Sequence, residues 1–259
     1  MWNLRVRMAR SFAPGSCVRQ FQTATPLFCC TVSRTTGWEC TVTGSGLCRI
    51  TTRFCFDARA HGNSGGGLAT YGLKEADDIH RWVDWIETAE RPRCMFGFGE
   101  SMGAAQLLQS LPKEPRFCAV VAESPFATFR EVAYARFGRP FHTGPWLGRT
   151  FFRPTVDADF LYVRFRYGLN MEAASPKRAV IGTKIPVLLI HGLQDRNIPP
   201  YHSDMIRAKN PSEVIVWKVP GAVHTGAHKA APQEFERRVL EWFAGHSSTA
   251  EPTSAPQSN

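Results

Sequence analysis

The sequence has no long apolar run. Its first residues, MWNLRVRMARSF, are basic, but no uninterrupted apolar stretch of about seven or more residues follows them, so a secretory signal is not expected. No segment approaches the roughly 20 apolar residues that a transmembrane helix needs. We therefore expect a cytoplasmic protein without a transmembrane segment.

Paired cysteines of the CxxC type are also absent. The chain has eight cysteines, and only two of them, Cys94 and Cys118, follow residue 57, where both lie in apolar runs. A buried free thiol is ordinary in such a run, and the cysteine spacings do not match those of a zinc site. We expect no disulfide framework, no metal and no organic cofactor.

Lysine is missing from residues 1–56, which hold seven arginines and a single acid, Glu39. This segment alone supplies +6 of the formal net charge of +9, because residues 57–259 hold 24 basic and 21 acidic side chains. A charge excess that is confined to one atypical segment does not indicate a basic binding face. A nucleic-acid partner is therefore not expected.

From residue 57 onward, strand-like apolar runs alternate with segments of helical periodicity. We expect strands at 93–99, 117–124, 186–192 and 213–219, and helices at 73–90, 104–111 and 232–246. This order predicts an α/β fold with a mostly parallel central sheet and helices on both faces. A chain of 259 residues is long enough for one such domain, which we place at 57–246.

Residues 125–176 interrupt this alternation with a block rich in aromatic residues and arginine. We interpret the block as an insertion at one sheet edge that acts as a lid, and surface helices without a role in binding are the alternative. Residues 247–259 have the polar, proline-containing composition that is typical of a disordered tail. The sequence does not indicate which oligomeric state the protein has.

One short segment, FGFGESMGAAQLLQSL at 96–111, contains the motif G-x-S-x-G around Ser101. Glycines on both sides of a serine allow a strand and a helix to meet in a sharp turn that exposes the hydroxyl. The N–H of Met102 would then lie at a helix N-terminus, where it can stabilise an oxyanion. A dinucleotide-binding loop that starts at Gly97 is excluded, because G-x-G-x-x-G requires glycine at position 102.

Two further polar residues follow expected strands. Asp195 comes after the run PVLLIHG, and His224 comes after the run EVIVWKV. Sites of open α/β sheets gather at the carboxyl ends of strands, and the chain order is that of nucleophile, acid and base. A serine hydroxyl is a weak nucleophile near pH 7, so a histidine is needed to take its proton. The alternative is that Asp195 only forms a turn and His224 is a hydrogen-bonded loop histidine.

Among the other histidines, only His228 is a further and weaker candidate for the base. His228 lies four residues beyond His224, in the approach to the last expected helix. His191 belongs to the end of an expected strand. His61 follows another strand, and a solvent-facing loop histidine is favoured there over a residue that lines the site.

From Asp57 to His246 the chain resembles the α/β-hydrolase fold superfamily, especially its prolyl-oligopeptidase-like and esterase-like members. The segment DARAHGNSGG at 57–66 is similar to the family segment that follows the fourth strand. The segment SPKRAVIGTKIPVLLIHGLQDRNIPP at 175–200 is similar to the return from the lid to the strand that precedes the acid.

The resemblance implies a catalytic triad in which Ser101 attacks an acyl carbonyl, His224 transfers the proton and Asp195 orients the imidazole. Met102 would supply one oxyanion donor. The implied function is that of a serine hydrolase, which cleaves a carboxylic ester, thioester or amide of a small-molecule acyl or peptide substrate without a cofactor. A prolyl-oligopeptidase-like peptidase and a non-catalytic hydrolase-like binding protein are the alternatives.

Residues 1–56 depart from the family pattern, because no strand followed by His-Gly, the usual source of the second oxyanion donor, is evident there. Moving the reading frame one base earlier turns Cys29 and Cys30 into leucine whichever codons encode them, and permits His-Gly at 31–32. We hypothesise that much of this segment is translated out of frame, so that the N-terminal strands are atypical or missing. A genuine divergent N-terminus is the alternative.

Overall fold

The computed structural model describes residues 27–31, 53–61 and 64–247. A six-stranded sheet has the order β2-β1-β3-β4-β5-β6, and all of its strand pairs are parallel. The strands are β1 Leu27–Thr31, β2 Arg53–Asp57, β3 Met95–Glu100, β4 Phe117–Glu123, β5 Val187–Gly192 and β6 Val214–Val219. The expected parallel sheet is therefore confirmed.

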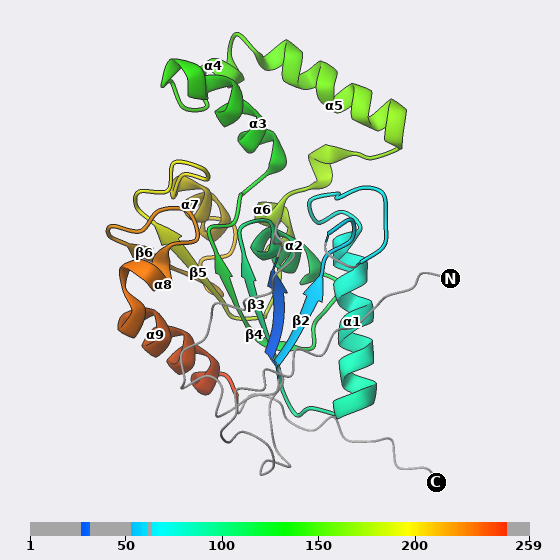
Figure 1. Ribbon diagram of the computed structural model, residues 1–259, viewed down its shortest axis with the longest axis vertical. Helices are drawn as coiled ribbons and strands as arrows, with labels where there is room; N and C mark the ends of the chain where they lie inside the picture. The colour runs from blue at the N-terminus through cyan, green and yellow to red at the C-terminus, as the bar shows by residue number, and fades with distance from the viewer. Residues whose placement is uncertain (1–26, 32–52, 62–63, 248–259) are drawn as a thin grey trace.

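Helices cover both faces of this sheet (Figure 1). The helices are α1 Glu75–Glu90, α2 Met102–Ser110, α3 Phe129–Gly138, α4 Trp146–Arg149, α5 Arg153–Tyr167, α6 Pro176–Ala179, α7 Tyr201–Arg207, α8 Ala227–Ala230 and α9 Pro232–Gly245, with short 3-10 turns η2 Arg139–Phe141 and η3 Met171–Ala173. One buried cluster joins α1, α2 and α7 to the strands, and a second joins α9 to them. The expected α/β architecture with helices on both faces is confirmed.

Alternate residues of the central strands supply these two clusters. Phe96 and Phe98 of β3 belong to the cluster under α9, whereas a Cβ at Gly97, between them, would lie 2.9 Å from the Leu107 side chain in α2. Successive side chains of a strand point to opposite faces, so glycine at position 97 lets α2 pack closely on β3. This close packing fixes the position of the turn that joins β3 to α2.

The first long helix has the apolar face that its periodicity predicts. Ile79, Trp82, Val83 and Ile86 of α1 are all buried, and the Trp82 ring stacks on the Phe56 ring with centroids 4.7 Å apart. Burial of each large apolar side chain contributes about 1.5 to 3 kcal/mol, so this face is sufficient to hold α1 against the sheet.

The chain order of the strands reverses beside β3. The chain passes from β1 outward to β2, and then crosses to β3 on the other side of β1. In open α/β sheets the crevice at the carboxyl ends of strands at such a reversal is the usual place for a site. Ser101 follows the last residue of β3, so the fold sets it at this point.

The block predicted at 125–176 lies between β4 and β5 and contains α3, α4 and α5. In Figure 1 these helices lie beyond the carboxyl ends of the strands. Within the insertion, Arg130 forms ion pairs with Asp157 of α5 and with Glu172. The role of the insertion as a lid stays a prediction.

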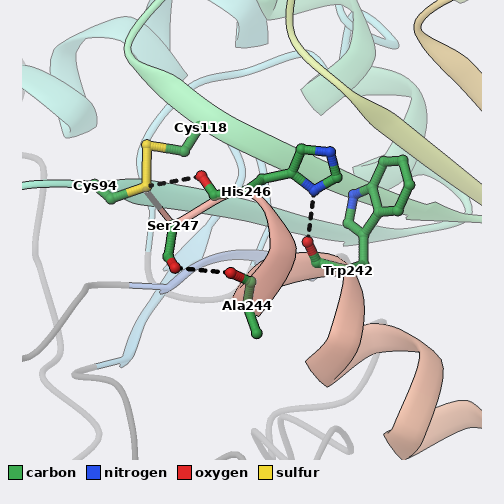
Figure 2. Close-up of a disulfide and its surroundings, with 6 residues drawn as sticks. All are labelled: Cys94, Cys118, Trp242, Ala244, His246 and Ser247. Atoms are coloured by element: carbon green, nitrogen blue, oxygen red, sulfur yellow. Dashed lines mark hydrogen bonds between the residues drawn. A yellow bond between two sulfur atoms is a disulfide. The ribbon is translucent and has the colours of Figure 1, made fainter. Parts of the chain in front are cut away.

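Cys94 and Cys118 form a disulfide (Figure 2), so the expectation of two free thiols is wrong. Cys94 directly precedes β3 and Cys118 is the second residue of its neighbour β4. The pairing of these strands brings the two Cα atoms to 5.8 Å, a separation that suits a disulfide. The apolar sequence context gave no sign of this pairing, because it depends on which strands are neighbours.

The N-terminal segment supplies two strands to the sheet. The alternative in which these strands are missing is wrong, since β1 pairs with both β2 and β3. The remainder of the segment, 1–26 and 32–52, lies outside the described residues, as does 248–259 of the predicted tail. No helix in the described part of the chain is long and apolar enough to cross a membrane.

Candidate active site

Ser101 stands in the turn between β3 and α2 with a left-handed backbone, φ 50° and ψ −113°. Its N–H donates to the Glu123 carbonyl at 2.8 Å, and its own carbonyl accepts from the Ala105 N–H at 3.1 Å. A Cβ at Gly99 would lie 2.8 Å from the Ala104 nitrogen. The first glycine of the motif is therefore required by the close approach of strand and helix, as the sequence predicted.

The structure brings the three predicted triad residues together. The Ser101 Oγ is 2.7 Å from the His224 Nε2, and the His224 Nδ1 is 2.7 Å from the Asp195 Oδ2. An ionised carboxylate can only accept, so the proton of the neutral imidazole is on Nδ1 and Nε2 accepts from the serine hydroxyl. This is the tautomer that a general base for Ser101 requires.

Asp195 is buried at the start of a tight loop after β5. Its Oδ1 accepts from the N–H groups of Asn197 and Ile198, both at 2.8 Å. Burial by itself would raise the pKa of this carboxyl, but hydrogen bonds from His191, His224 and the Ile198 N–H outweigh it and hold the pKa well below its usual range. The group is therefore an anion that can stabilise a positive charge on His224.

His191 fixes the loop that holds Asp195. It is fully buried at the end of β5; its Nε2 donates to the Ile198 carbonyl at 2.7 Å and its Nδ1 accepts from the Ser203 hydroxyl at 2.7 Å. The separation between its Nε2 and the Asp195 Oδ2 is longer, 3.4 Å, so we regard the carbonyl as the main acceptor of that proton. As predicted, His191 belongs to the strand end.

The other two candidate histidines do not contact Ser101. The His228 Nε2 lies 3.4 Å from the Glu236 Oε1, and the ring packs edge-on against Phe235. The His61 Nδ1 lies 2.9 Å from the Arg59 carbonyl in its own loop. The geometry thus favours His224 over both as the partner of the serine.

Glu123 was not predicted as part of the site. It ends β4, and its buried carboxyl accepts from the Ala227 N–H at 2.9 Å, three residues after His224. Burial raises the pKa of this carboxyl to about 8, and the nearby Glu100 and Asp195 contribute in the same direction. Glu123 therefore holds the His224 loop against β4. The sequence signal was a polar pair, Glu-Ser, directly after an apolar run.

Three of the seven non-glycine residues with positive φ in the described ranges lie in or beside the loops of the triad. Ser101, Ser124 and Thr225 have φ values of 50°, 51° and 49°, and the Thr225 N–H donates to the Ser124 Oγ at 3.3 Å. A left-handed residue other than glycine costs of order 1 to 3 kcal/mol and occurs most often at functional sites. The three strained residues follow β3, β4 and β6, so they surround one point at the carboxyl edge.

Of the two predicted oxyanion donors, the Met102 N–H belongs to the described residues. Met102 is the first residue of α2, so its N–H has no partner within the helix. The loop in which the second donor is expected, after β1, lies outside the described residues. Within the described ranges no group of three His, Cys, Asp or Glu side chains is arranged to hold a metal ion.

Two bacterial proteins are similar in sequence to this chain. The uncharacterized protein YqkD of Bacillus subtilis is 25% identical over 191 residues, which is 73% of this chain and 60% of that protein. The uncharacterized protein YfhR of Escherichia coli is 27% identical over 180 residues, 67% of this chain and 53% of that protein. The chain thus spans less than two thirds of the length of these relatives.

Solved structures with the same fold include an esterase and a peptidase. The Pyrococcus furiosus esterase Pf2001 has a TM-score of 0.66 at 20% identity, with 87% of this chain and 84% of that chain covered. An acylaminoacyl peptidase of Pyrococcus horikoshii has a TM-score of 0.66 at 16% identity, with 92% of this chain and 39% of that chain covered. At these identities the likeness concerns the fold.

The match to a family model covers most of the chain. The model of the alpha/beta hydrolase family matches residues 35–239, a range that includes β2 to β6 and all three residues of the hydrogen-bonded triad. Three features of the structure agree with that match: the order of the strands, the turn at Ser101, and the positions of Asp195 and His224 after later strands. The chain belongs to the alpha/beta hydrolase family.

Proposed function

We propose that the chain is a serine hydrolase that cleaves a carboxylic ester, thioester or amide through a covalent acyl-enzyme. The observation that supports the proposal most strongly is the continuous pair of 2.7 Å hydrogen bonds from Ser101 to His224 and from His224 to Asp195. A serine in this arrangement has an adjacent base, and that base is hydrogen-bonded to a carboxylate anion.

In the first half of the reaction the Ser101 Oγ attacks the acyl carbonyl carbon while its proton passes to the His224 Nε2. The carbonyl oxygen becomes an oxyanion, which the Met102 N–H at the start of α2 would stabilise. Collapse of this intermediate breaks the bond to the leaving group, and the His224 proton passes to the departing oxygen, sulfur or nitrogen. The acyl group is then bonded to Ser101.

In the second half a water molecule replaces the leaving group. His224 takes a proton from the water, and the hydroxide attacks the acyl carbon. The bond to the Ser101 Oγ then breaks, the carboxylic acid departs and the proton returns from His224 to the serine. The Asp195 carboxylate stabilises the imidazolium in both halves, because the Nδ1–H of His224 stays hydrogen-bonded to it.

The acyl group and the leaving group are proposed only as classes. An esterase and an acylaminoacyl peptidase share this fold, so a small-molecule acyl substrate and a peptide substrate are both compatible with it. We favour the ester or thioester. The alcohol or thiol that leaves from such a substrate needs less protonation than an amine does, so the demand on His224 as proton donor is smaller.

Stopped-flow kinetics with p-nitrophenyl acetate tests the proposal. We expect a burst of nitrophenolate equal to the amount of enzyme, and an acetyl adduct on the Ser101 peptide in acid-quenched samples. A matched series of ester and amide substrates with one acyl group then separates esterase from peptidase. Substrate binding without burst or adduct would contradict the proposal and favour a non-catalytic binding protein.

A further inference from the structure

Helix α5 has two apolar faces, and only one of them is packed. On the inner face Val156 is buried, and Phe160 and Val163 pack against the small core of Leu169, Met171 and Ala174. On the outer side Leu161, Tyr162 and Phe165 are 52%, 60% and 81% exposed. The Tyr162 ring lies edge-on to the Tyr167 ring of the same helix, with centroids 6.3 Å apart, and none of the three side chains belongs to a buried cluster of the described residues.

The outer residues form a single stripe. Successive residues of an α-helix are about 100° apart, so positions 161, 162 and 165 lie on one side, together with Ala158, and opposite to 156, 160 and 163. An ordinary surface helix has an apolar stripe only toward its core. A second stripe that faces solvent indicates a binding surface.

Two arginines flank this outer stripe. At about 100° per residue, Arg164 and Arg166 fall on either side of it. Within the described residues neither forms an ion pair, and the Arg166 guanidinium lies 5.1 Å from the Tyr167 ring centre. Of the carboxylates at the other end of α5, Asp157 is ion-paired with Arg130, and Asp159 is exposed. The C-terminal half of the helix is therefore cationic around an apolar centre.

The whole insertion shares this character. Seven of the 12 exposed large hydrophobic side chains of the described residues lie between 129 and 167, among them Phe141, Trp146 and Phe151. The same range holds seven arginines, no lysine and three acidic residues. In Figure 1 α4 and α5 lie at the end of the molecule that is remote from α9, so this end can approach a flat surface.

We propose that the outer face of α5 binds to an anionic lipid surface. Leucine and aromatic side chains would enter the headgroup region, while Arg164 and Arg166 would reach lipid phosphates on both sides. A second copy of the chain is a poorer occupant, because symmetric pairing of two α5 stripes would bring the flanking arginines of both copies together.

Vesicle flotation tests this proposal without any measurement of catalysis. The chain should float with vesicles of equal parts phosphatidylcholine and phosphatidylserine, and should remain unbound with phosphatidylcholine alone. The double variant L161Q/F165Q should lose binding. The variant R164Q/R166Q should bind on the order of 30-fold more weakly, since each arginine near an anionic surface contributes roughly a fivefold change in affinity.

Matched substitutions elsewhere control for charge and exposure. I181Q/I215Q changes two side chains that are 57% and 50% exposed, and R81Q/R207Q removes two exposed arginines of α1 and α7; both should bind as the unaltered chain does. Melting temperatures confirm that all variants are folded. Failure to bind the anionic vesicles, equal binding to both vesicle types, or a dimer that L161Q/F165Q abolishes would overturn the proposal.

Discussion

His224 lies between the serine hydroxyl and the aspartate carboxylate, at 2.7 Å from each. Replacement by alanine removes the proton acceptor of Ser101. We therefore expect His224→Ala to lower turnover on the order of 10⁶-fold, as loss of the base of a triad does. Steady-state hydrolysis of an activated ester measures this.

His228→Ala is the matched control, because the two histidines are only four residues apart and His228 faces Glu236. It should retain turnover within a few-fold of the unaltered chain. An inactive His228→Ala beside an active His224→Ala would contradict the assignment of the base.

The raised pKa of Glu123 leads us to expect that the stability of the fold depends on pH. Its pKa is about 8 in the folded protein and 4.5 for the free group, so between these values the folded chain keeps a proton that the unfolded chain has lost. The free energy of unfolding must then fall as pH rises through this range. Glu123→Gln cannot ionise, and its melting temperature should fall less from about pH 5 to pH 8.

Calorimetric melting of both proteins across this range gives the comparison. Glu100 and Asp195 are present in both, so their contributions largely cancel in the difference. Two parallel curves of melting temperature against pH would show that Glu123 is not protonated in the folded protein.

Sequence order was sufficient to predict that Ser101, Asp195 and His224 lie together, because each follows a strand whose end is fixed by the sheet. Their catalytic roles stay a prediction. Glu123 and His191 could not be assigned in this way. Their roles depend on contacts with Ala227 and Ile198, and these contacts arise only when neighbouring strands bring distant loops together.

The strands β3 and β4 are joined at their amino ends by the disulfide between Cys94 and Cys118, which are 24 residues apart in sequence. Closing a loop of this length restricts the unfolded chain and typically contributes about 3 kcal/mol. We expect C94A/C118A to lower the free energy of unfolding by about this amount, as measured by urea denaturation under oxidising conditions. Reductant should bring the unaltered chain close to the variant.

The site provides a second readout for the same variant. Ser101 lies at the opposite end of β3 from Cys94, so reactivity at the serine should persist in C94A/C118A at temperatures where it is folded. Equal urea midpoints with and without reductant would show that the disulfide does not form in the protein.

The strands from β3 onward and the helices α1, α2 and α9 were predictable because their periodicities are clear, as the buried face of α1 demonstrates. The helices α3 to α8 were not predicted individually. The position of β1 was not predictable, because the run Leu27–Thr31 contains two cysteines and lacks the aliphatic run that β4 and β5 contain. Its place between β2 and β3 follows from tertiary pairing.

For the molecule as a whole, we propose that much of residues 1–56 is encoded out of frame. In the alternative frame His-Gly can occupy 31–32, and position 31 is the last residue of β1, which pairs with the strand that leads to Ser101. A form with the restored frame would gain a second oxyanion donor, and we expect its acylation rate to be about 10²- to 10³-fold higher. Soluble yield and acylation rate of both forms give the comparison.

Sequencing of the gene gives an independent check. A single-base change should restore an apolar strand that ends in His-Gly. Equal acylation rates and equally cooperative melting of the two forms would show that the N-terminal segment works as written.

The proposed chemistry depends most on Ser101 as an activated nucleophile, and labelling with a fluorophosphonate probe followed by peptide mapping tests this directly. We predict one adduct, on the peptide that contains Ser101, absent from Ser101→Ala and strongly slowed in His224→Ala. An adduct on a different serine, or no adduct on a chain that melts cooperatively, would contradict this role of Ser101.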